Sequence, residues 1–271
     1  MFHSAEREDR TFSLAFASKP GMRAALVVAA IAIALAGLTS QAAFDETEHV
    51  TRTLSLEPGG ALRLKSFSGQ VLITASDRAE VTVDALRHAS RSVLDQIALD
   101  IHKDGNTVNI DANRRVSRSR WRHHEDVVET DFDIKVPRHT DLDVTVFSAP
   151  VSVRGVEGSY TVHTFSSRVV LDDVAGPIRA HSFNGPVEIR ARSWSDDQSI
   201  DVDTFSGNID LRLPAAARGS VSFNSFSGHL DSGLPLVLRS SSRRHLQAEL
   251  GGGGDGTLRF KTFSGNVRIN R

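Results

Sequence analysis

Alternation of apolar and polar residues dominates the chain from about residue 50 onward. Runs such as 144–146, 151–153, 187–189 and 209–211 place valine, isoleucine or leucine at every second position. A period of two is that of a β-strand with one buried face. Glycine, proline, asparagine and aspartate separate the runs, as tight turns require. The pattern therefore predicts an all-β fold built from many short strands.

A short motif, Thr/Ser-Phe-Ser-Gly and its variants, recurs where these runs end. From Phe147 to Phe226 its phenylalanines lie 18, 18, 22 and 21 residues apart, which suits one coil of a stacked repeat. We therefore expect a β-solenoid-like stack of short strands with coils of roughly 18–22 residues. The motif residues, to which we assign a structural role, are Phe67, Phe147, Phe165, Phe183, Phe205, Phe226 and Phe263 with Gly69, Gly185, Gly207, Gly228 and Gly265.

The two ends of this region follow the pattern less closely. In the N-terminal half, Asp104-Gly105 stands between the alternating runs 97–102 and 107–111, which is a strong signal for an antiparallel hairpin inserted into the fold. Near the C-terminus, Phe226 and Phe263 are 37 residues apart, close to two periods. We expect an intervening coil that has lost the motif.

The alternation raises a question about the motif phenylalanines. In residues 200–205, strict alternation buries Ile200, Val202 and Thr204 and places Phe205 on the opposite face. Seven rings placed in this way would form an apolar ladder larger than monomers usually leave in water. We therefore expect the chain to bend at the motif glycine, which tolerates positive φ, so that the rings are buried. A ladder covered by another segment and a ladder used as a binding surface are the alternatives.

One basic segment, residues 113–126, lies outside the repeat pattern. It carries Arg114, Arg115, Arg118, Arg120, Trp121 and Arg122, and an acidic stretch follows it. Such a set could contact phosphate or nucleic acid. We favour an exposed loop whose charge is offset by the acidic residues, with an anionic envelope glycolipid as the alternative contact. No nucleic-acid partner is expected.

Four aspartates are the best candidates for catalysis. Asp172, Asp173, Asp201 and Asp203 could form the carboxylate cluster of a β-helical enzyme that acts on polysaccharides. They fall at bends or at outward positions, however, where solvated aspartate is expected. No nucleophile elbow, phosphate-binding loop or zinc-binding helix motif occurs. We predict that the protein is not an enzyme and uses no cofactor.

Two histidines are related by the repeat. His163 and His181 lie 18 residues apart, so adjacent coils would bring them within about 5 Å. A shared metal or a response to pH would need further groups, and no third ligand has a suitable spacing. We therefore expect two solvent-facing side chains and no metal site.

Composition changes this picture little. The chain is 39% hydrophobic and 24% charged, with a formal net charge of -1, which argues against a general polyanion-binding surface. It has no cysteine, so disulfides, thiolate nucleophiles and cysteine-based metal sites are excluded.

Residues 1–43 have the pattern of a targeting region. Met22-Arg23 precedes the apolar run 24–38, and small residues follow at 39–43. The run is shorter than the roughly 20 residues of a membrane span, so a secretory signal peptide is favoured over an N-terminal membrane anchor. We expect cleavage after Ala42 or Ala43, and Met22 could be the true start. Residues 44–271 would then form a single exported β-repeat domain, periplasmic or at the cell surface.

The repeats also resemble a known family. Residues 56–64 (Leu-Glu-Pro-Gly-Gly-Ala-Leu-Arg-Leu), residues 132–137 (Phe-Asp-Ile-Lys-Val-Pro) and the copies that end in residues 258–269 are similar to the bacterial putative-adhesin family of β-strand repeats, a domain of unknown function. The resemblance covers about residues 45–271. It implies a β-solenoid-like fold and an exported or envelope-associated role, and it supplies no catalytic residues.

These observations together predict an exported, non-enzymatic β-repeat protein that serves as a structural or adhesin-like binding scaffold of the cell envelope. The expected partner is an envelope protein or a polysaccharide. The alternatives are a β-helical enzyme that acts on polysaccharides and an interaction module of envelope-stress signalling, in which the loop at 113–126 would contact the membrane or a partner.

Overall fold

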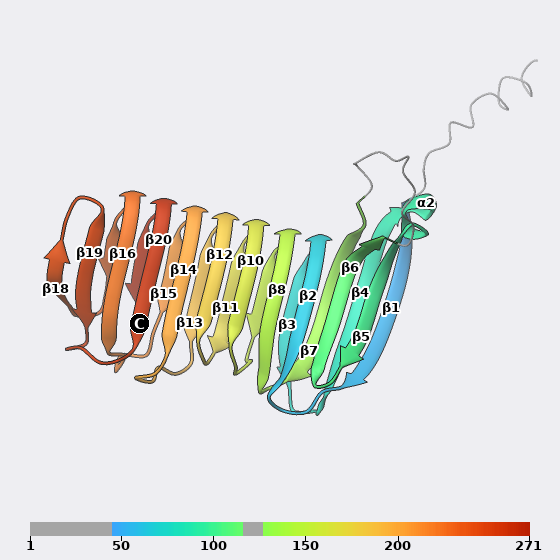
Figure 1. Cartoon of the computed structure of the whole chain (residues 1–271), viewed down its shortest axis with the longest axis horizontal. Helices are drawn as coiled ribbons and strands as arrows, with labels where there is room; N and C mark the ends of the chain where they lie inside the picture. Colours follow the sequence, from blue (N-terminus) through green and yellow to red (C-terminus); the bar gives the residue numbers. More distant parts are fainter. Residues whose placement is uncertain (1–44, 116–126) are drawn as a thin grey trace, which may run out of the picture. The chain divides into compact units, whose positions relative to one another are not determined.

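The computed structural model describes residues 45–115 and 127–271. Almost all elements in these ranges are strands, which confirms the predicted all-β class (Figure 1). The described helix, α2 (Arg91–Leu94), is a single turn. Nothing helical in the described ranges is both long and apolar enough to cross a membrane. The predicted targeting region and Arg118, Arg120, Trp121 and Arg122 lie outside the described residues.

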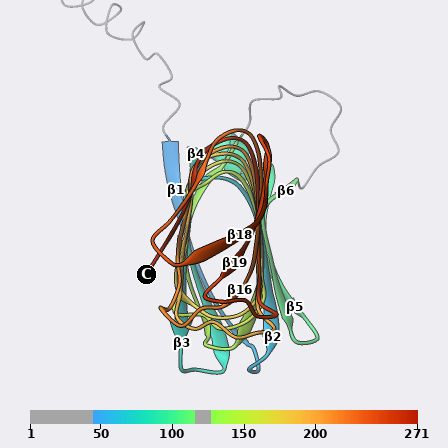
Figure 2. The same cartoon turned by 90° about the vertical axis from the view of Figure 1, so that its left-hand side faces the viewer.

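Within the described residues, backbone pairing joins 21 strands into one sheet that folds over on itself, so that two rows of strands face each other (Figure 2). In spatial order, the first row contains β5 (Ile97–Asp104), β6 (Thr107–Arg115), β2 (Gly60–Ser68), β8 (Thr140–Ser148), β10 (Tyr160–Ser166), β12 (Ile178–Asn184), β14 (Ser199–Ser206), β20 (Thr257–Ser264), β16 (Gly219–Ser227), β19 (His245–Leu250) and β18 (Leu236–Ser241). The second row contains β1 (Asp45–Ser55), β4 (Glu80–Ser90), β7 (Glu129–Pro137), β3 (Val71–Ser76), β9 (Val151–Arg154), β11 (Val169–Val174), β13 (Val187–Ala191), β15 (Ile209–Arg212), β21 (Val267–Asn270) and β17 (Leu230–Ser232).

In the middle of the sheet, a first-row strand and the second-row strand that follows it in the chain make up one coil. Successive coils stack in parallel and in register. Tyr160 of β10 pairs with Leu142 of β8 on one side and with Ile178 of β12 on the other, an offset of 18 residues each way. Because strand positions alternate between the two faces, each inward residue meets the inward residue of the next coil. The result is a continuous core of valine, isoleucine and leucine between the two rows.

The predicted N-terminal hairpin is confirmed. β5 and β6 pair antiparallel around Gly105, whose φ of +58° suits a tight two-residue turn. β1, β4 and β7 also pair antiparallel in the second row. This end of the sheet is therefore antiparallel, whereas the middle is parallel.

The order of the coils at both ends departs from the order of the chain. The coil β2–β3 lies between the later coils β6–β7 and β8–β9. At the other end, β20–β21 lies between β14–β15 and β16–β17. Among the strands that the structure describes, only the coils from β8 through β15 follow one another in both chain and space.

The expectation of a coil without a motif between Phe226 and Phe263 is therefore wrong. The hairpin β18–β19 covers the outer edge of β16, and the chain then returns to fill the position between β14 and β16. The long spacing reflects this return path. The same phenylalanine spacing is compatible with coils stacked in chain order and with coils stacked in the observed order. The spacing alone could therefore not reveal the return path.

Candidate binding surface

The motif phenylalanines lie on the outside of the first row, which contradicts the expectation that they are buried. Their exposed fractions run from 39% at Phe67 to 54% at Phe226. The strand alternation simply continues through the motif. The residue before each ring is turned inward instead, as at Thr204, which is 1% exposed.

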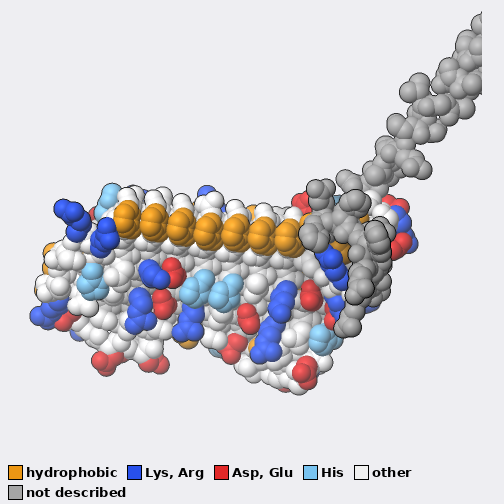
Figure 3. Space-filling model, turned by 45° about the horizontal axis from the view of Figure 1, so that its top comes forward, with side chains coloured by type: hydrophobic (Ala, Val, Ile, Leu, Met, Phe, Trp, Pro, Cys, Tyr) orange, Lys and Arg blue, Asp and Glu red, His pale blue; other side chains and the backbone are white. Residues whose placement is uncertain are grey.

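The seven rings form one line, which we call the phenylalanine ladder. Its spatial order is Phe67, Phe147, Phe165, Phe183, Phe205, Phe263 and Phe226. Neighbouring ring centroids are 4.6–4.9 Å apart, and the ring planes differ by 7° or less. Figure 3 shows the resulting band of hydrophobic side chains along one face.

The ladder follows directly from the backbone. Parallel strands in register are about 4.8 Å apart, and identical positions of successive coils therefore hold their rings at that distance. Each inner ring has both faces against its neighbours. The ladder consequently presents ring edges to the solvent, while the ring faces are already occupied.

The glycines that follow the ladder serve close packing between coils. A Cβ on Gly207 would lie 2.1 Å from the carbonyl oxygen of Gly185, and one on Gly265 would lie 2.1 Å from that of Gly207. Gly69 and Gly185 do have positive φ, at +102° and +142°, but Gly207 and Gly265 are not among the positive-φ glycines. The bend we expected thus explains only part of the glycine pattern, and close approach of neighbouring backbones explains the rest.

A shallow groove runs beside the centre of the ladder. Its outward side chains, two positions before the rings on the same strands, are Thr145, His163, His181 and Asp203. We call this the ladder groove. Its opposite wall is formed by the rings of Phe165, Phe183 and Phe205. On the far side of the ladder are small exposed polar residues, among them Ser148, Ser166 and Asn184.

The two histidines of the ladder groove meet as the repeat spacing predicts. The ring centroids of His163 and His181 are 5.0 Å apart and the rings are stacked. Across residues 45–115 and 127–271, no three histidine or acidic side chains gather closely enough to hold a metal ion.

An arginine that the sequence did not single out covers one end of the ladder. The Arg244 guanidinium lies 4.3 Å from the ring centroid of Phe226, a cation–π distance. Sequence offered no signal for it, because Arg244 lies on the turn of the hairpin β18–β19 and reaches the ladder through the antiparallel pairing of β19 with β16.

Two arginines of the basic segment lie in the described part of the chain. Arg114 is paired with Asp100 at 2.5 Å, and Arg115 is exposed at the end of β6. The carboxylate that pairs with Arg114 thus comes from the neighbouring strand β5 and not from the acidic stretch that follows the segment.

The four candidate aspartates do not share a groove. Asp172 and Asp173 lie on β11 in the second row, whereas Asp201 and Asp203 lie on β14 in the first. Each is paired with a cation: Asp172 with Arg154 and Arg190, Asp173 with Arg192, Asp201 with Arg259, and Asp203 with Lys261. These pairs link one coil to the next.

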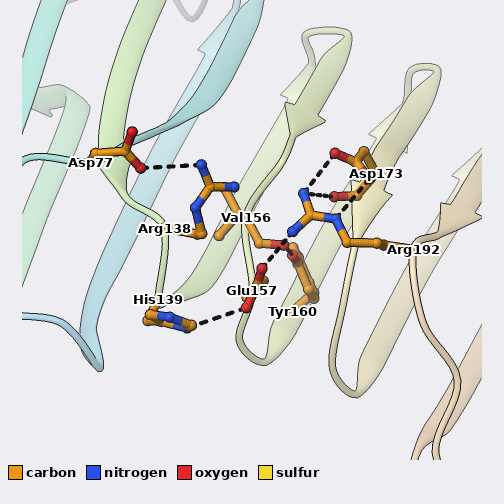
Figure 4. A network of polar contacts seen from close by, with 8 residues as sticks. All are labelled: Asp77, Arg138, His139, Val156, Glu157, Tyr160, Asp173 and Arg192. Atoms are coloured by element: carbon orange, nitrogen blue, oxygen red, sulfur yellow. Dashed lines mark hydrogen bonds and ion pairs between the residues drawn. The ribbon is translucent and has the colours of Figure 1, made fainter.

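A separate ionic cluster joins three successive coils (Figure 4). Arg192 donates to both carboxylate oxygens of Asp173 at 2.6 and 2.8 Å and to Glu157 at 2.5 Å. Glu157 in turn lies 3.5 Å from His139. Asp173 has a φ of +57°, a conformation that the two hydrogen bonds from Arg192 help to hold.

Tyr160 lies behind this cluster with its hydroxyl buried. The hydroxyl donates to the carbonyl oxygen of Val156, and burial raises the pKa of Tyr160 well above its usual range. A neutral tyrosine whose hydroxyl is bonded to a backbone oxygen is suited to a structural role in the packed interior. We therefore interpret the cluster as a clamp between coils.

Replacing Arg192 should weaken this clamp in a pH-dependent way. The hydrogen bonds from Arg192 hold the pKa of Asp173 below its ordinary value, so their contribution to stability is present above that ordinary value and is lost as pH falls through the folded one. We expect Arg192→Gln to cost up to about 1 kcal/mol at pH 7, since the side chains are partly exposed. Urea unfolding at a series of pH values from 7 downward measures this.

Arg192→Lys is the matched control for this prediction. It keeps the positive charge but cannot form the bidentate contact, so it should recover only part of the loss. Two results would contradict the interpretation of this cluster as a clamp. One is equal stability of Arg192→Gln and the natural protein at pH 7, and the other is a difference in stability that does not shrink as pH falls.

Comparisons with known proteins find only weak similarity to solved structures. No family model matches the chain. No curated protein matches it.

A solved structure of a putative cell adhesion protein from Clostridium sporogenes is 9% identical, with a TM-score of 0.45, and the match covers 82% of this chain and 99% of that one. A putative adhesin from Parabacteroides merdae has a TM-score of 0.31 at 9% identity, covering 82% and 96%. A putative lipid binding protein from Parabacteroides distasonis has a TM-score of 0.29 at 11% identity, with the same coverage. At these scores the similarity assigns this chain to no family.

Proposed function

We propose that the protein is an exported, envelope-associated scaffold without enzymatic activity, and that it binds its partner through the phenylalanine ladder. The ladder is the observation that carries this proposal. Seven rings, each 39–54% exposed, form a single apolar surface. With about 200 Å² for a fully exposed phenylalanine, the rings present roughly 600 Å². Apolar patches of this size on soluble proteins mark interaction sites.

We further propose that the coils are those of a β-solenoid-like fold, as the resemblance to the bacterial putative-adhesin family implies. The parallel offsets of 18 residues in the middle of the sheet support this proposal. Export, to the periplasm or the cell surface, is supported by the apolar run and small residues at 24–43.

The geometry of the ladder limits what it can bind. Aromatic residues that bind sugars do so through a free ring face, but the inner rings of the ladder have both faces occupied. Ring edges suit another apolar surface that can lie along the line of rings. The ladder therefore favours a protein or lipid partner over a polysaccharide. The enzymatic alternative gains no support, because the four candidate aspartates are divided between two rows and paired with cations.

Replacing the central rings should abolish binding to envelope material. We expect the triple variant Phe165→Ser/Phe183→Ser/Phe205→Ser to lose at least about tenfold in the fraction retained on washed bacterial envelopes, because these rings lie at the centre of the surface. The matched control is Leu72→Ser/Val237→Ser/Leu238→Ser, which removes exposed apolar side chains outside the ladder. Circular dichroism would confirm that both variants are folded. Unchanged retention of the ladder variant would refute the proposal.

A further inference from the structure

We infer that the partner of the phenylalanine ladder is a second copy of this chain, with the ladder of each copy lying in the ladder groove of the other. This inference rests on the proposed role of the ladder as a binding surface. It identifies the occupant of that surface, and retention on envelopes would then be a property of the dimer, which the serine variant loses together with the dimer.

The surface is complementary to itself in shape. A raised line of rings and a shallow groove lie side by side on the same face of the same strands. The two features have the same direction, because each ring and each groove residue are two positions apart on one strand, and the groove runs along the central rings Phe165, Phe183 and Phe205. A second copy therefore offers a ridge that matches the groove and a groove that matches the ridge.

Symmetry then determines the orientation. An isologous contact uses one two-fold axis and the same patch on both copies. Only an axis that runs parallel to the ladder, between the ridge and the groove, places each ridge over the other copy's groove. An axis perpendicular to the ladder would instead place ridge on ridge. The inferred dimer therefore has its two ladders side by side and pointing in the same direction.

The area is adequate for a stable dimer. The rings alone supply roughly 600 Å² per copy, and a standard interface buries about 800 Å² per partner. The groove residues Thr145, His163, His181 and Asp203 would add to this area. The line of seven rings, with steps of 4.6–4.9 Å, is roughly 29 Å long, which suits an interface of that size.

Charge around the centre of the ladder also favours a second copy over an anionic membrane. His163 and His181 are stacked on each other, and Asp203 is paired with Lys261 at 3.3 Å. The charge at the centre of the ladder groove is therefore balanced, and single cations stand at the two ends of the ladder, Lys65 beside Phe67 and Arg244 on Phe226. Peripheral binding to anionic lipid depends instead on clusters of lysine and arginine.

Sedimentation velocity of the purified chain tests the inference. We expect a dimer at micromolar concentrations. Phe183→Asp places a charge at the centre of the interface and should weaken dimerisation at least about a hundredfold. The matched control is Leu72→Asp, since Leu72 is 37% exposed and lies on β3 in the second row. It should leave the dimer intact.

Cysteine cross-linking tests the orientation, and the absence of natural cysteines leaves no background. Lys65 stands beside Phe67 near one end of the ladder. In the inferred dimer, Lys65→Cys lies near its own counterpart, so a short bismaleimide should link the two copies. In the antiparallel dimer the two cysteines would lie at opposite ends. Arg212→Cys on β15 in the second row should not cross-link.

Each outcome has one meaning. Suppose that the chain stays monomeric at a 100-fold higher concentration than expected, while the triple serine variant still loses envelope binding. This result would overturn the inference that the partner is a second copy, and it would leave the proposed function standing. Binding of the monomer to phosphatidylglycerol vesicles through the ladder would do the same. A dimer that Phe183→Asp does not weaken overturns this inference, and envelope binding that survives the serine variant overturns the proposed function itself.

Discussion

Removing residues 257–271 should unfold the C-terminal end of the sheet well beyond the deleted segment. β16 pairs in parallel with β20, and β17 pairs with β21, so these contacts hold the preceding coil in place. The deletion also removes the fully buried side chains of Phe260 and Ile269, each of which contributes roughly 2 kcal/mol. Hydrogen exchange should show that residues 219–250 lose protection while β8 to β13 retain it.

A deletion of equal length elsewhere provides the control. The hairpin β18–β19 can be replaced by a short Gly-Ser linker, because Gly251 donates to the carbonyl oxygen of Pro235 at 3.1 Å and the two ends are already adjacent. This change should leave residues 219–232 protected, since β16 still pairs with β20. Protection of β16 that persists after loss of residues 257–271 would show that the coils follow chain order after all.

Gly207→Ala should destabilise the protein by about 3 kcal/mol or more. The added methyl group would lie 2.1 Å from the carbonyl oxygen of Gly185, and that oxygen belongs to the backbone of the neighbouring coil. Backbone cannot move aside as the end of a flexible side chain can. The two coils would have to separate, which disturbs the stacking of Phe183 on Phe205 and the core beneath them. The midpoint of guanidinium unfolding measures this loss.

Gly59→Ala is the matched comparison. Gly59 has a φ of +79°, so alanine is strained there, but no atom lies within 4 Å of the added carbon. We expect a cost of about 1 kcal/mol. A cost at Gly207 no larger than the cost at Gly59 would contradict close approach of coils as the reason for this motif glycine.

Much of the local structure could be predicted from the sequence, because alternation and turn residues are local signals. The runs around Val144, Val151 and Ile209 are strands, and Asp104-Gly105 lies at the predicted hairpin turn. The coil length also placed His163 beside His181. Each of these features depends on residues that are close in the sequence or separated by one period.

The position of the phenylalanine rings could not be decided from general rules. The alternation of Ile200, Val202 and Thr204 placed Phe205 outside, and the structure agrees with that alternation. The usual burial of aromatic residues argued the other way and was wrong here. Stacking between coils explains the exception, since each inner ring covers the faces of its neighbours and leaves only its edge in water.

The order of the end coils depends on contacts between distant residues. Phe263 stacks on both Phe205 and Phe226, and no local pattern distinguishes this from a stack in chain order. The contact of Arg244 with Phe226 depends on the pairing of β19 with β16, which no local pattern indicates either. Such features require the three-dimensional structure.

Hydroxyl-radical footprinting of the phenylalanines tests the central claim most directly. In dilute solution the ladder rings should oxidise readily, while Phe132 and Phe260, which are at most 2% exposed, should not. On washed envelopes, or at concentrations where copies associate, the central rings Phe165, Phe183 and Phe205 should become protected by at least about tenfold. Ladder rings that oxidise equally under all these conditions would contradict the claim that the ladder is the binding surface.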